Sequence, residues 1–319
     1  MIAFVALTMS TATDAPLPNL DARFALRNEA IEAFRRDGHV CLRGVAAPEE
    51  IEVFSPLIQR CALAHSLERR ALEERDRYGR AFLQMINLWL VDAQVQAFVF
   101  SRRFAALAAE LLGVKSVRLY HDQALFKEAG GGFTPWHQDQ YYWPIDTEDT
   151  ITLWMPLETV PVEVGGMHFV SGSQREGHLG DYAIGDESQA VFDAWIKEKG
   201  RTVASVGAMA AGDATFHHGW VVHGAAANQS DRLRPAMTMI YFRDGARVAP
   251  LDHPARRFDA AMYLPDCAEG EAAAGAFCPR LHPREAGPLP APPAQDDAYR
   301  KRIFAALAET RAQREPSAD

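Results

Sequence analysis

The sequence predicts a mainly β domain, a barrel or a sandwich, with flanking helices and a helical layer at its N-terminal end. Two observations carry this prediction. Before about residue 115, apolar residues recur at helical spacing, and after it short β-prone segments follow one another with turn residues between them. Because these segments do not alternate regularly with helices, a closed or double-sheet β structure is favoured over a parallel sheet. Such a structure has a cavity at its mouth in which a small ligand can bind.

Three helices are expected in the N-terminal third. The first contains Ile31 and Phe34 and ends at Gly38, and a short strand over 39–45 follows it. Pro48 begins a long helix, whose apolar face is formed by Ile51, Phe54, Leu57, Ile58 and Cys61. A third helix, ending at Gly113, contains Phe104, Leu107, Ala108, Leu111 and Leu112.

The strands are expected from Val117 onward. Besides the segment that begins there, the β-prone stretches are 151–157, 166–170, 202–206, 214–216 and 236–242, and a helix near 191–197 interrupts them. A Pro/Ala-rich linker at 287–293 and a final helix near 298–309 follow. The chain therefore divides into a disordered leader (1–20, with Met9 an alternative start), a single domain (21–285) and a linker with a C-terminal helix (286–319).

Composition limits the classes of partner. The 319 residues include 33 Lys and Arg against 42 Asp and Glu, a net charge of −9, which disfavours binding to nucleic acid or to an anionic membrane. Four scattered cysteines without a C-x-x-C pair indicate a reducing compartment, and no apolar run approaches about 18 residues. We expect a soluble, cytoplasmic protein, monomeric or homo-oligomeric, that acts on a small molecule.

The motif His137-Gln138-Asp139 is the strongest local signal for chemistry. On an extended segment, side chains two residues apart point to the same face, so the imidazole and the carboxylate would meet. With a second histidine from a later strand, they would form a 2-His-1-carboxylate site, which leaves coordination positions open and suits non-haem Fe(II). The candidates for that histidine are His217, His218 and His223.

An arginine follows this histidine cluster. Arg234 lies eleven residues after His223, directly before the apolar strand 236–242. A buried guanidinium requires an anion, and its planar fork matches a carboxylate. A dicarboxylate that chelates the metal at one end could meet Arg234 at the other.

Together these residues resemble the phytanoyl-CoA dioxygenase family of Fe(II)/2-oxoglutarate oxygenases. The resemblance spans roughly residues 34–242. It rests on His137-x-Asp139, His223 and Arg234 and on motifs in the family's order: Gln123–Lys127, Thr134–Asp139, Thr152–Leu157, Gly165–Ser173 and Gly212–Thr215. It implies a double-stranded β-helix (a jelly roll, cupin-like) with Fe(II), 2-oxoglutarate and O₂ in its mouth.

The resemblance also implies roles for single residues. His137, Asp139 and His223 match the iron ligands, which are also the catalytic residues. Arg234 matches the partner of the distal carboxylate of 2-oxoglutarate, Trp154 an aromatic lining of that pocket, and Gln123 and Gln138 further cosubstrate contacts. A serine common two residues after the second histidine is Ala225 here, and Thr134 or Thr152 could replace it. Ser171 and Gln174 depart from the family's Pro-Gly-Ser-His turn.

Several residues keep two interpretations. Tyr141, Tyr142 and Trp143 could form a substrate wall or plain core, and Lys127 could face substrate or hold the glycine loop 130–132. His217 and His218 are expected in a turn or in contact with a metal ligand, rather than as ligands themselves. Arg232 is expected in solvent, and His121 with Asp122 as a strand-edge pair.

We expect an oxygenase that hydroxylates an unactivated C–H bond and releases succinate and CO₂. Desaturation or ring formation is an open alternative. Related halogenases lack the carboxylate found here at Asp139, which favours hydroxylation. Two other classes are a non-catalytic jelly-roll protein that binds metal or 2-oxoglutarate, and a zinc hydrolase with a metal-bound water. The hydrolase would leave Arg234 unexplained.

Overall fold

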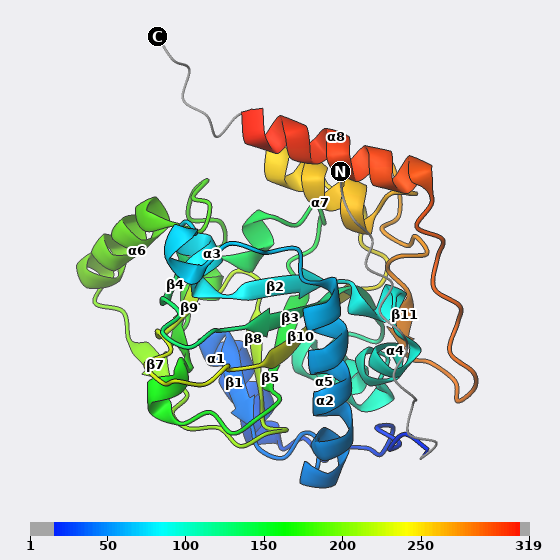
Figure 1. Ribbon diagram of the computed structural model, residues 1–319, viewed down its shortest axis with the longest axis horizontal. Helices are drawn as coiled ribbons and strands as arrows, with labels where there is room; N and C mark the ends of the chain where they lie inside the picture. Colours follow the sequence, from blue (N-terminus) through cyan, green and yellow to red (C-terminus); the bar gives the residue numbers. More distant parts are fainter. Residues whose placement is uncertain (1–15, 313–319) are drawn as a thin grey trace.

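Two antiparallel sheets form the centre of the molecule (Figure 1), which we describe from a computed structural model covering residues 16–312. The larger sheet has the order β1-β8-β5-β10-β3-β11, with β2 also paired to β3. Its strands are β1 (His39–Leu42), β2 (Leu83–Ile86), β3 (Val117–Phe126), β5 (Thr150–Pro156), β8 (Ala214–His218), β10 (Ala236–Arg243) and β11 (Arg280–His282).

The smaller sheet has the order β4-β9-β6-β7. Its strands are β4 (Thr134–His137), β6 (Met167–Val170), β7 (Val203–Ser205) and β9 (His223–Ala225). Side chains of both sheets meet in one apolar cluster, in which Trp154 of the larger sheet packs with Phe169 of the smaller. The space between the sheets is therefore a shared interior, and it contains the candidate site.

Helices from the first third of the chain cover the outer face of the larger sheet (Figure 1). They are α1 (Asn28–Asp37), α2 (Pro48–His65), α4 (Ala93–Val99) and α5 (Arg102–Leu112), whereas the short helix α3 (Arg77–Ala81) lies apart from them, where Arg77 forms an ion pair with Asp186. The apolar face predicted for α2 is the face it buries, with Phe54 1% and Ile58 0% exposed. Burial of this stripe against the sheet is what stabilises an amphipathic helix in a protein.

Three further helices lie outside this layer. α6 (Asp186–Lys199) lies against β4, while α7 (Pro254–Tyr263) and α8 (Asp297–Ala312) run side by side at one end of the sheets (Figure 1). Tyr299 anchors α8: its ring stacks on Phe277, and its hydroxyl donates to the carbonyl of Met262. None of the described helices combines the length and apolar composition needed to cross a bilayer.

The coarse prediction, a sheet-rich fold with flanking helices, is confirmed, and the three N-terminal helices are present. The sequence missed the strands β2, β4, β9 and β11 and the helices α3, α4 and α7. Most of the expected leader lies outside the described residues, but Leu20 is 3% exposed and its carbonyl accepts from the hydroxyl of Ser101, so the packed chain begins before residue 21.

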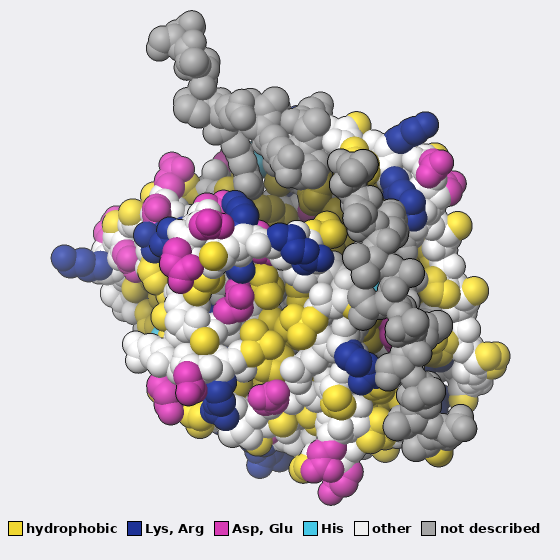
Figure 2. Space-filling model, viewed as in Figure 1, with side chains coloured by type: hydrophobic (Ala, Val, Ile, Leu, Met, Phe, Trp, Pro, Cys, Tyr) yellow, Lys and Arg dark blue, Asp and Glu magenta, His cyan; other side chains and the backbone are white. Residues whose placement is uncertain are grey.

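On the face shown in Figure 2, Lys and Arg side chains are scattered among Asp and Glu. The described part of that face carries no concentrated basic patch, in keeping with the acidic balance of the sequence. The four cysteines, all within the described residues, are unpaired.

Candidate metal centre

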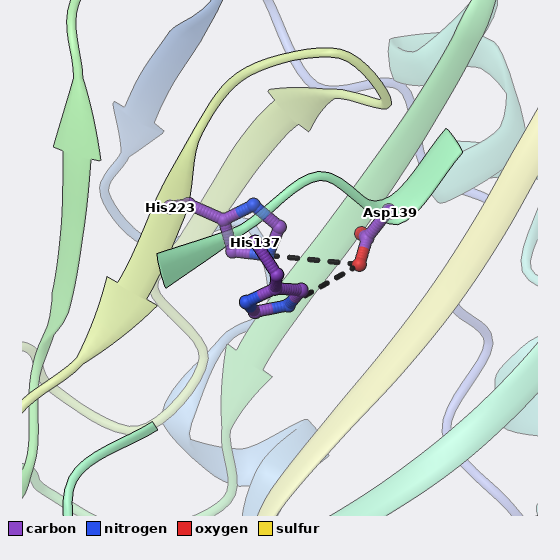
Figure 3. Close-up of side chains that lie close together, drawn as sticks. All are labelled: His137, Asp139 and His223. Carbon is purple, nitrogen blue, oxygen red and sulfur yellow. Dashed lines mark ion pairs between the residues drawn. The ribbon is translucent and has the colours of Figure 1, made fainter. Parts of the chain in front are cut away.

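Three side chains from two segments of the chain converge between the sheets. His137 is the last residue of β4 and His223 the first of β9, and the two lie opposite each other in the antiparallel register. Their ring centres are 4.1 Å apart. Gln138 keeps an extended backbone, so Asp139, although it begins a short 3-10 turn, returns to the side of His137 (Figure 3). The alternation predicted for the H-x-D motif therefore holds.

The candidate ligand atoms are close enough to share one ion. Oδ1 of Asp139 lies 3.5 Å from Nε2 of His137 and 3.7 Å from Nε2 of His223. One ligand atom from each of the three residues lies within 4.8 Å of the others. Each imidazole is oriented through its other nitrogen, since Nδ1 lies 2.8 Å from the carbonyl of Pro135 in His137 and 3.1 Å from the carbonyl of Val221 in His223. A proton on Nδ1 leaves the lone pair of Nε2 free for a metal.

The electrostatics favour the protonation states that a metal requires. Burial, with His137 adding to it, lowers the pKa of His223 well below its usual range. Burial by itself would raise the pKa of Asp139, but His223, His137 and His217 around it outweigh burial and hold that pKa well below its usual range. Neutral imidazoles and an ionised carboxylate are the forms that bind metal.

This donor set fits a ferrous ion. Two imidazole nitrogens and one carboxylate oxygen on one face leave the opposite face open, the arrangement used by non-haem Fe(II) oxygenases. Thiolates, which would favour zinc or an iron–sulfur cluster, are absent from the described cluster.

Arg234 lies buried in the same interior without an acidic partner among the described residues. It is 3% exposed, and its guanidinium carbon lies 5.0 Å from the ring centre of Trp154. Two of its N–H groups donate to the carbonyls of Gly165 and Leu125, while Nε has no partner. A buried cation with an unused donor requires an anion. Arg232, by contrast, is exposed, as the sequence predicted.

Lys127 is a second buried cation near Arg234, and the two residues form a backbone bridge. Its ammonium donates to the carbonyl of Gly132 and to the hydroxyl of Thr134. Of its two predicted roles, this contact supports the one that holds the glycine loop. Burial, with Arg234 as the next cause, lowers the pKa of Lys127 well below its usual range.

The side chains of the two glutamines expected to contact the cosubstrate have different hydrogen-bond partners. Gln123 lies on β3 and accepts a hydrogen bond from Gln84. Gln138 is turned away from the metal side of its strand. Its amide donates to the carbonyls of Gly177 and Trp220, and its oxygen accepts from the N–H of Leu179. All of these partners are backbone groups, which argues against the cosubstrate contact expected for Gln138.

The three aromatic residues that follow the H-x-D motif lie in different surroundings. Trp143 is 5% exposed and packs edge-on against Tyr120 in an interior cluster, so it has the core role. The hydroxyl of Tyr141 lies 2.9 Å from Nε2 of His253, just before α7, and the hydroxyl of Tyr142 accepts from the N–H of Ile184. The hydroxyls of these two tyrosines thus contact the loops around the H-x-D motif, a position compatible with the substrate wall expected for them.

Four further polar residues have defined surroundings. His217 lies on β8, is 1% exposed, and its Nε2 is 3.5 Å from Oδ2 of Asp139, so of its two expected places it has the one beside a candidate ligand and not the one in a turn. His218 ends β8 and accepts from the N–H of Trp220. His121 and Asp122 are not the expected edge pair, because both are buried within β3 and Asp122 accepts from the backbone of Leu88.

Comparison with known proteins gives consistent results. Residues 34–236 match the family model for phytanoyl-CoA dioxygenase (PhyH). The chain is 26% identical over 151 residues to a probable alpha-ketoglutarate-dependent hypophosphite dioxygenase of Stutzerimonas stutzeri, a match covering 46% of this chain and 52% of that protein. It is 26% identical over 161 residues to a phytanoyl-CoA dioxygenase of Arabidopsis thaliana, covering 50% and 56%. The chain thus spans about half the length of the curated relatives it matches.

Solved structures extend the likeness to most of the chain. The epimerase SnoN, in complex with Fe3+, alpha ketoglutarate and nogalamycin RO, has a TM-score of 0.65 and 28% identity over 80% of this chain and 98% of that one. The carbocyclase SnoK shares the fold, with a TM-score of 0.67 at 23% identity over 83% and 99%. With the family match covering most of its length, the chain belongs to the phytanoyl-CoA dioxygenase family.

Proposed function

We propose that this protein is an Fe(II)/2-oxoglutarate-dependent oxygenase of a small-molecule metabolite. The observation that carries the proposal is the pairing of two features in one interior. His137, Asp139 and His223 form a three-ligand face, and a buried Arg234 without an acidic partner lies beyond Trp154. A zinc hydrolase would not need that arginine, and a non-catalytic protein that binds 2-oxoglutarate would use it without releasing succinate.

Each residue has a separate task in this proposal. His137, Asp139 and His223 hold the iron, and Arg234, beside Trp154, holds the distal carboxylate of 2-oxoglutarate. Gln123 and Thr134 are proposed to border the cosubstrate, and Tyr141 and Tyr142 the substrate. When bound, Fe(II) with 2-oxoglutarate reduces O₂, so that one oxygen atom enters succinate, CO₂ leaves, and the other oxidises the substrate.

The finer parts of the proposal concern fold and reaction. The two packed sheets are proposed to form a double-stranded β-helix, within a single domain that begins near Leu17 and is followed by a C-terminal linker and helix. Hydroxylation of an unactivated C–H bond is the proposed outcome, supported by the carboxylate of Asp139. The unpaired cysteines support a reducing, cytoplasmic location.

Two measurements test the proposal. First, Co(II) should raise the melting temperature of metal-free protein, and the effect should disappear in His137→Ala and His223→Ala. His168→Ala is the matched control, because His168 pairs with Gly224 on the neighbouring strand and lies on the outer face of the small sheet, lining a shallow surface pocket there. Its metal response should equal that of the wild type.

Second, the protein with Fe(II), 2-oxoglutarate and O₂ should release succinate in the presence of its substrate. A panel of hypophosphite, acyl thioesters and glycosylated polycyclic compounds covers the reactions in the names of its relatives and the substrates of its family. A product one oxygen heavier indicates hydroxylation, and one two hydrogens lighter indicates desaturation or ring closure. Succinate release that persists in His137→Ala would refute the assignment.

A further inference from the structure

Two side chains of the larger sheet reach the metal site from the side opposite its ligands. Thr152 on β5 and His217 on β8 are direct partners in the antiparallel register. Side chains of directly opposed residues stand next to each other on the same face of a sheet. Thr152 is 4% and His217 1% exposed, so this pair belongs to the interior between the sheets.

Both side chains meet the same oxygen of Asp139. The hydroxyl of Thr152 donates to Oδ2 at 3.0 Å, and Nε2 of His217 lies 3.5 Å from Oδ2. The two candidate iron-binding imidazoles are instead nearest to Oδ1, at 3.5 and 3.7 Å. The carboxylate therefore has two different sides, with Oδ1 among the metal ligands and Oδ2 facing the larger sheet.

His217 has no other use for its polar atoms. Among the described residues neither of its ring nitrogens has a hydrogen-bond partner, and its ring is packed against Phe169 and His223, with centres 5.3 and 4.4 Å away. A buried imidazole without partners destabilises a fold, and an apolar ring would fill the same space better. Because packing does not explain a histidine here, we look for its role at the group that Nε2 faces, which is Oδ2 of Asp139.

We propose that His217 is a positioning residue that, together with Thr152, holds Oδ2 of Asp139 away from the metal. The inference rests on the proposed metal site. With its hydrogen on Nε2, His217 points an N–H at an oxygen 3.5 Å away that already accepts a hydrogen bond from Thr152, and a small approach when the metal binds would complete a second one. A carboxylate with Oδ2 occupied in this way binds through Oδ1 alone.

The consequence concerns the number of open positions on the metal. A carboxylate that binds through both oxygens would take a fourth position, and too few would remain for a chelating cosubstrate and O₂. Donors to the non-ligating oxygen prevent this, which is the usual task of residues that contact a metal ligand without touching the metal. The pair Thr152–His217 therefore keeps three positions open.

The test is a titration of metal-free protein with Co(II), followed by its visible absorption spectrum. His217→Phe keeps a ring of similar size but removes the donor, and it should weaken Co(II) binding about 10-fold or more and change the shape of the spectrum. His217→Gln retains an N–H at a comparable reach and should restore both properties to within about 3-fold of the wild type. Thr152→Val should weaken binding in the same direction as His217→Phe.

Metal-free stability separates positioning from packing. The melting temperature of metal-free His217→Phe should equal or exceed that of the wild type, because the unpartnered imidazole is gone. The inference is overturned if His217→Phe binds Co(II) with wild-type affinity and spectrum, or if His217→Gln is as impaired as His217→Phe. If the wild-type protein itself does not bind Co(II), the metal site fails and the inference with it. If the wild type binds Co(II), but His217→Phe and His217→Gln have the same affinity and spectrum as each other, the metal site stands and His217 does not have this role.

Discussion

The guanidinium of Arg234 lies over the indole of Trp154, 5.0 Å from its ring centre, with no carboxylate of the described chain beside it. Trp154 is on β5, two residues beyond Thr152, which contacts Asp139. One strand thus carries a contact to the metal ligand and a contact to the arginine, about 7 Å apart at the usual rise of a strand. That spacing suits a short dicarboxylate lying along β5.

Replacing Arg234 should remove cosubstrate binding selectively. Arg234→Leu takes away a charge-assisted, bidentate contact, which is worth about 3 kcal/mol, or ~100-fold in the dissociation constant of 2-oxoglutarate. Calorimetric titration of the Co(II) form with 2-oxoglutarate measures it. Arg232→Leu, which removes an exposed arginine two residues away, should bind as the wild type does. Equal affinities in all three proteins would remove Arg234 from the cosubstrate site.

Gly165 should matter for the same cosubstrate through its backbone. Its carbonyl accepts from Arg234, it has φ +87°, and a Cβ there would lie 2.8 Å from the carbonyl oxygen of Ala226 and 3.0 Å from Cδ of Lys127. Since the Ala226 carbonyl is backbone and cannot swing aside, Gly165→Ala should shift Arg234 and weaken 2-oxoglutarate binding about 10-fold, the effect of disturbing one contact to a charged group.

Gly207→Ala is the matched control for that variant. Gly207 also has a positive φ, +74°, but a Cβ there meets nothing within 4 Å. Both variants carry the conformational strain of alanine at positive φ, roughly 1 kcal/mol, so both should melt slightly earlier. Only Gly165→Ala should lose affinity for 2-oxoglutarate in calorimetry. A matching loss in Gly207→Ala would assign the effect to strain alone.

Local spacing predicted that His137 and Asp139 share one side, but the choice of His223 among three histidines came from the family resemblance. The H-x-D motif needs only local strand geometry, which the extended Gln138 preserves. The sequence could not decide between the two places expected for His217, because its position depends on the pairing of β8 with β5, a contact between segments more than 60 residues apart. Gln138 was misjudged for a related reason: its amide is used by loops that only the folded chain brings to it.

The fold was predicted where a pattern is long enough to be periodic. The helix that contains Phe54 has a continuous apolar stripe over 18 residues, whereas α4 has only 7 residues. Strands of three or four residues, such as β9 and β11, are too short to show alternation and exist because neighbouring strands pair with them. The helix α7 begins at Pro254, directly after His253, a start signal that was visible in the sequence but was not used, because it lies after the last expected strand.

The C-terminal helix should contribute to stability through Tyr299. This residue is 5% exposed, stacks on Phe277 with ring centres 4.7 Å apart, and donates to Met262. Tyr299→Ala should lower the free energy of unfolding by about 3 kcal/mol, as for other large buried rings. Phe304→Ala, in the same helix but 68% exposed, should change it by less than about 0.5 kcal/mol. Urea unfolding measures both, and equal effects would mean that α8 does not dock as described.

Asp259 on α7 is a buried carboxyl in an apolar cluster beside the larger sheet. It is 9% exposed and accepts a hydrogen bond from the hydroxyl of Tyr120 at 2.9 Å. Burial raises its pKa to about 8, although the bond from Tyr120 acts in the opposite direction. In the unfolded chain an aspartate has a pKa of about 4. Between these two values the folded chain holds a proton that the unfolded chain has lost.

Asp259→Asn should therefore flatten the dependence of stability on pH. Because the unfolded state binds fewer protons between about pH 4 and 8, the contribution of Asp259 to stability is full below pH 4 and is lost as the pH rises to about 8. Asparagine stays neutral and still accepts from Tyr120. The melting temperature of the variant should match the wild type near pH 4 and exceed it by roughly 10 °C at pH 8, because a separation of about four pKa units is equivalent to roughly 5 kcal/mol. Asp266→Asn, at an exposed position near the end of α7, should show no such divergence. Parallel curves for Asp259→Asn and the wild type would mean that this carboxyl is ionised in the folded protein.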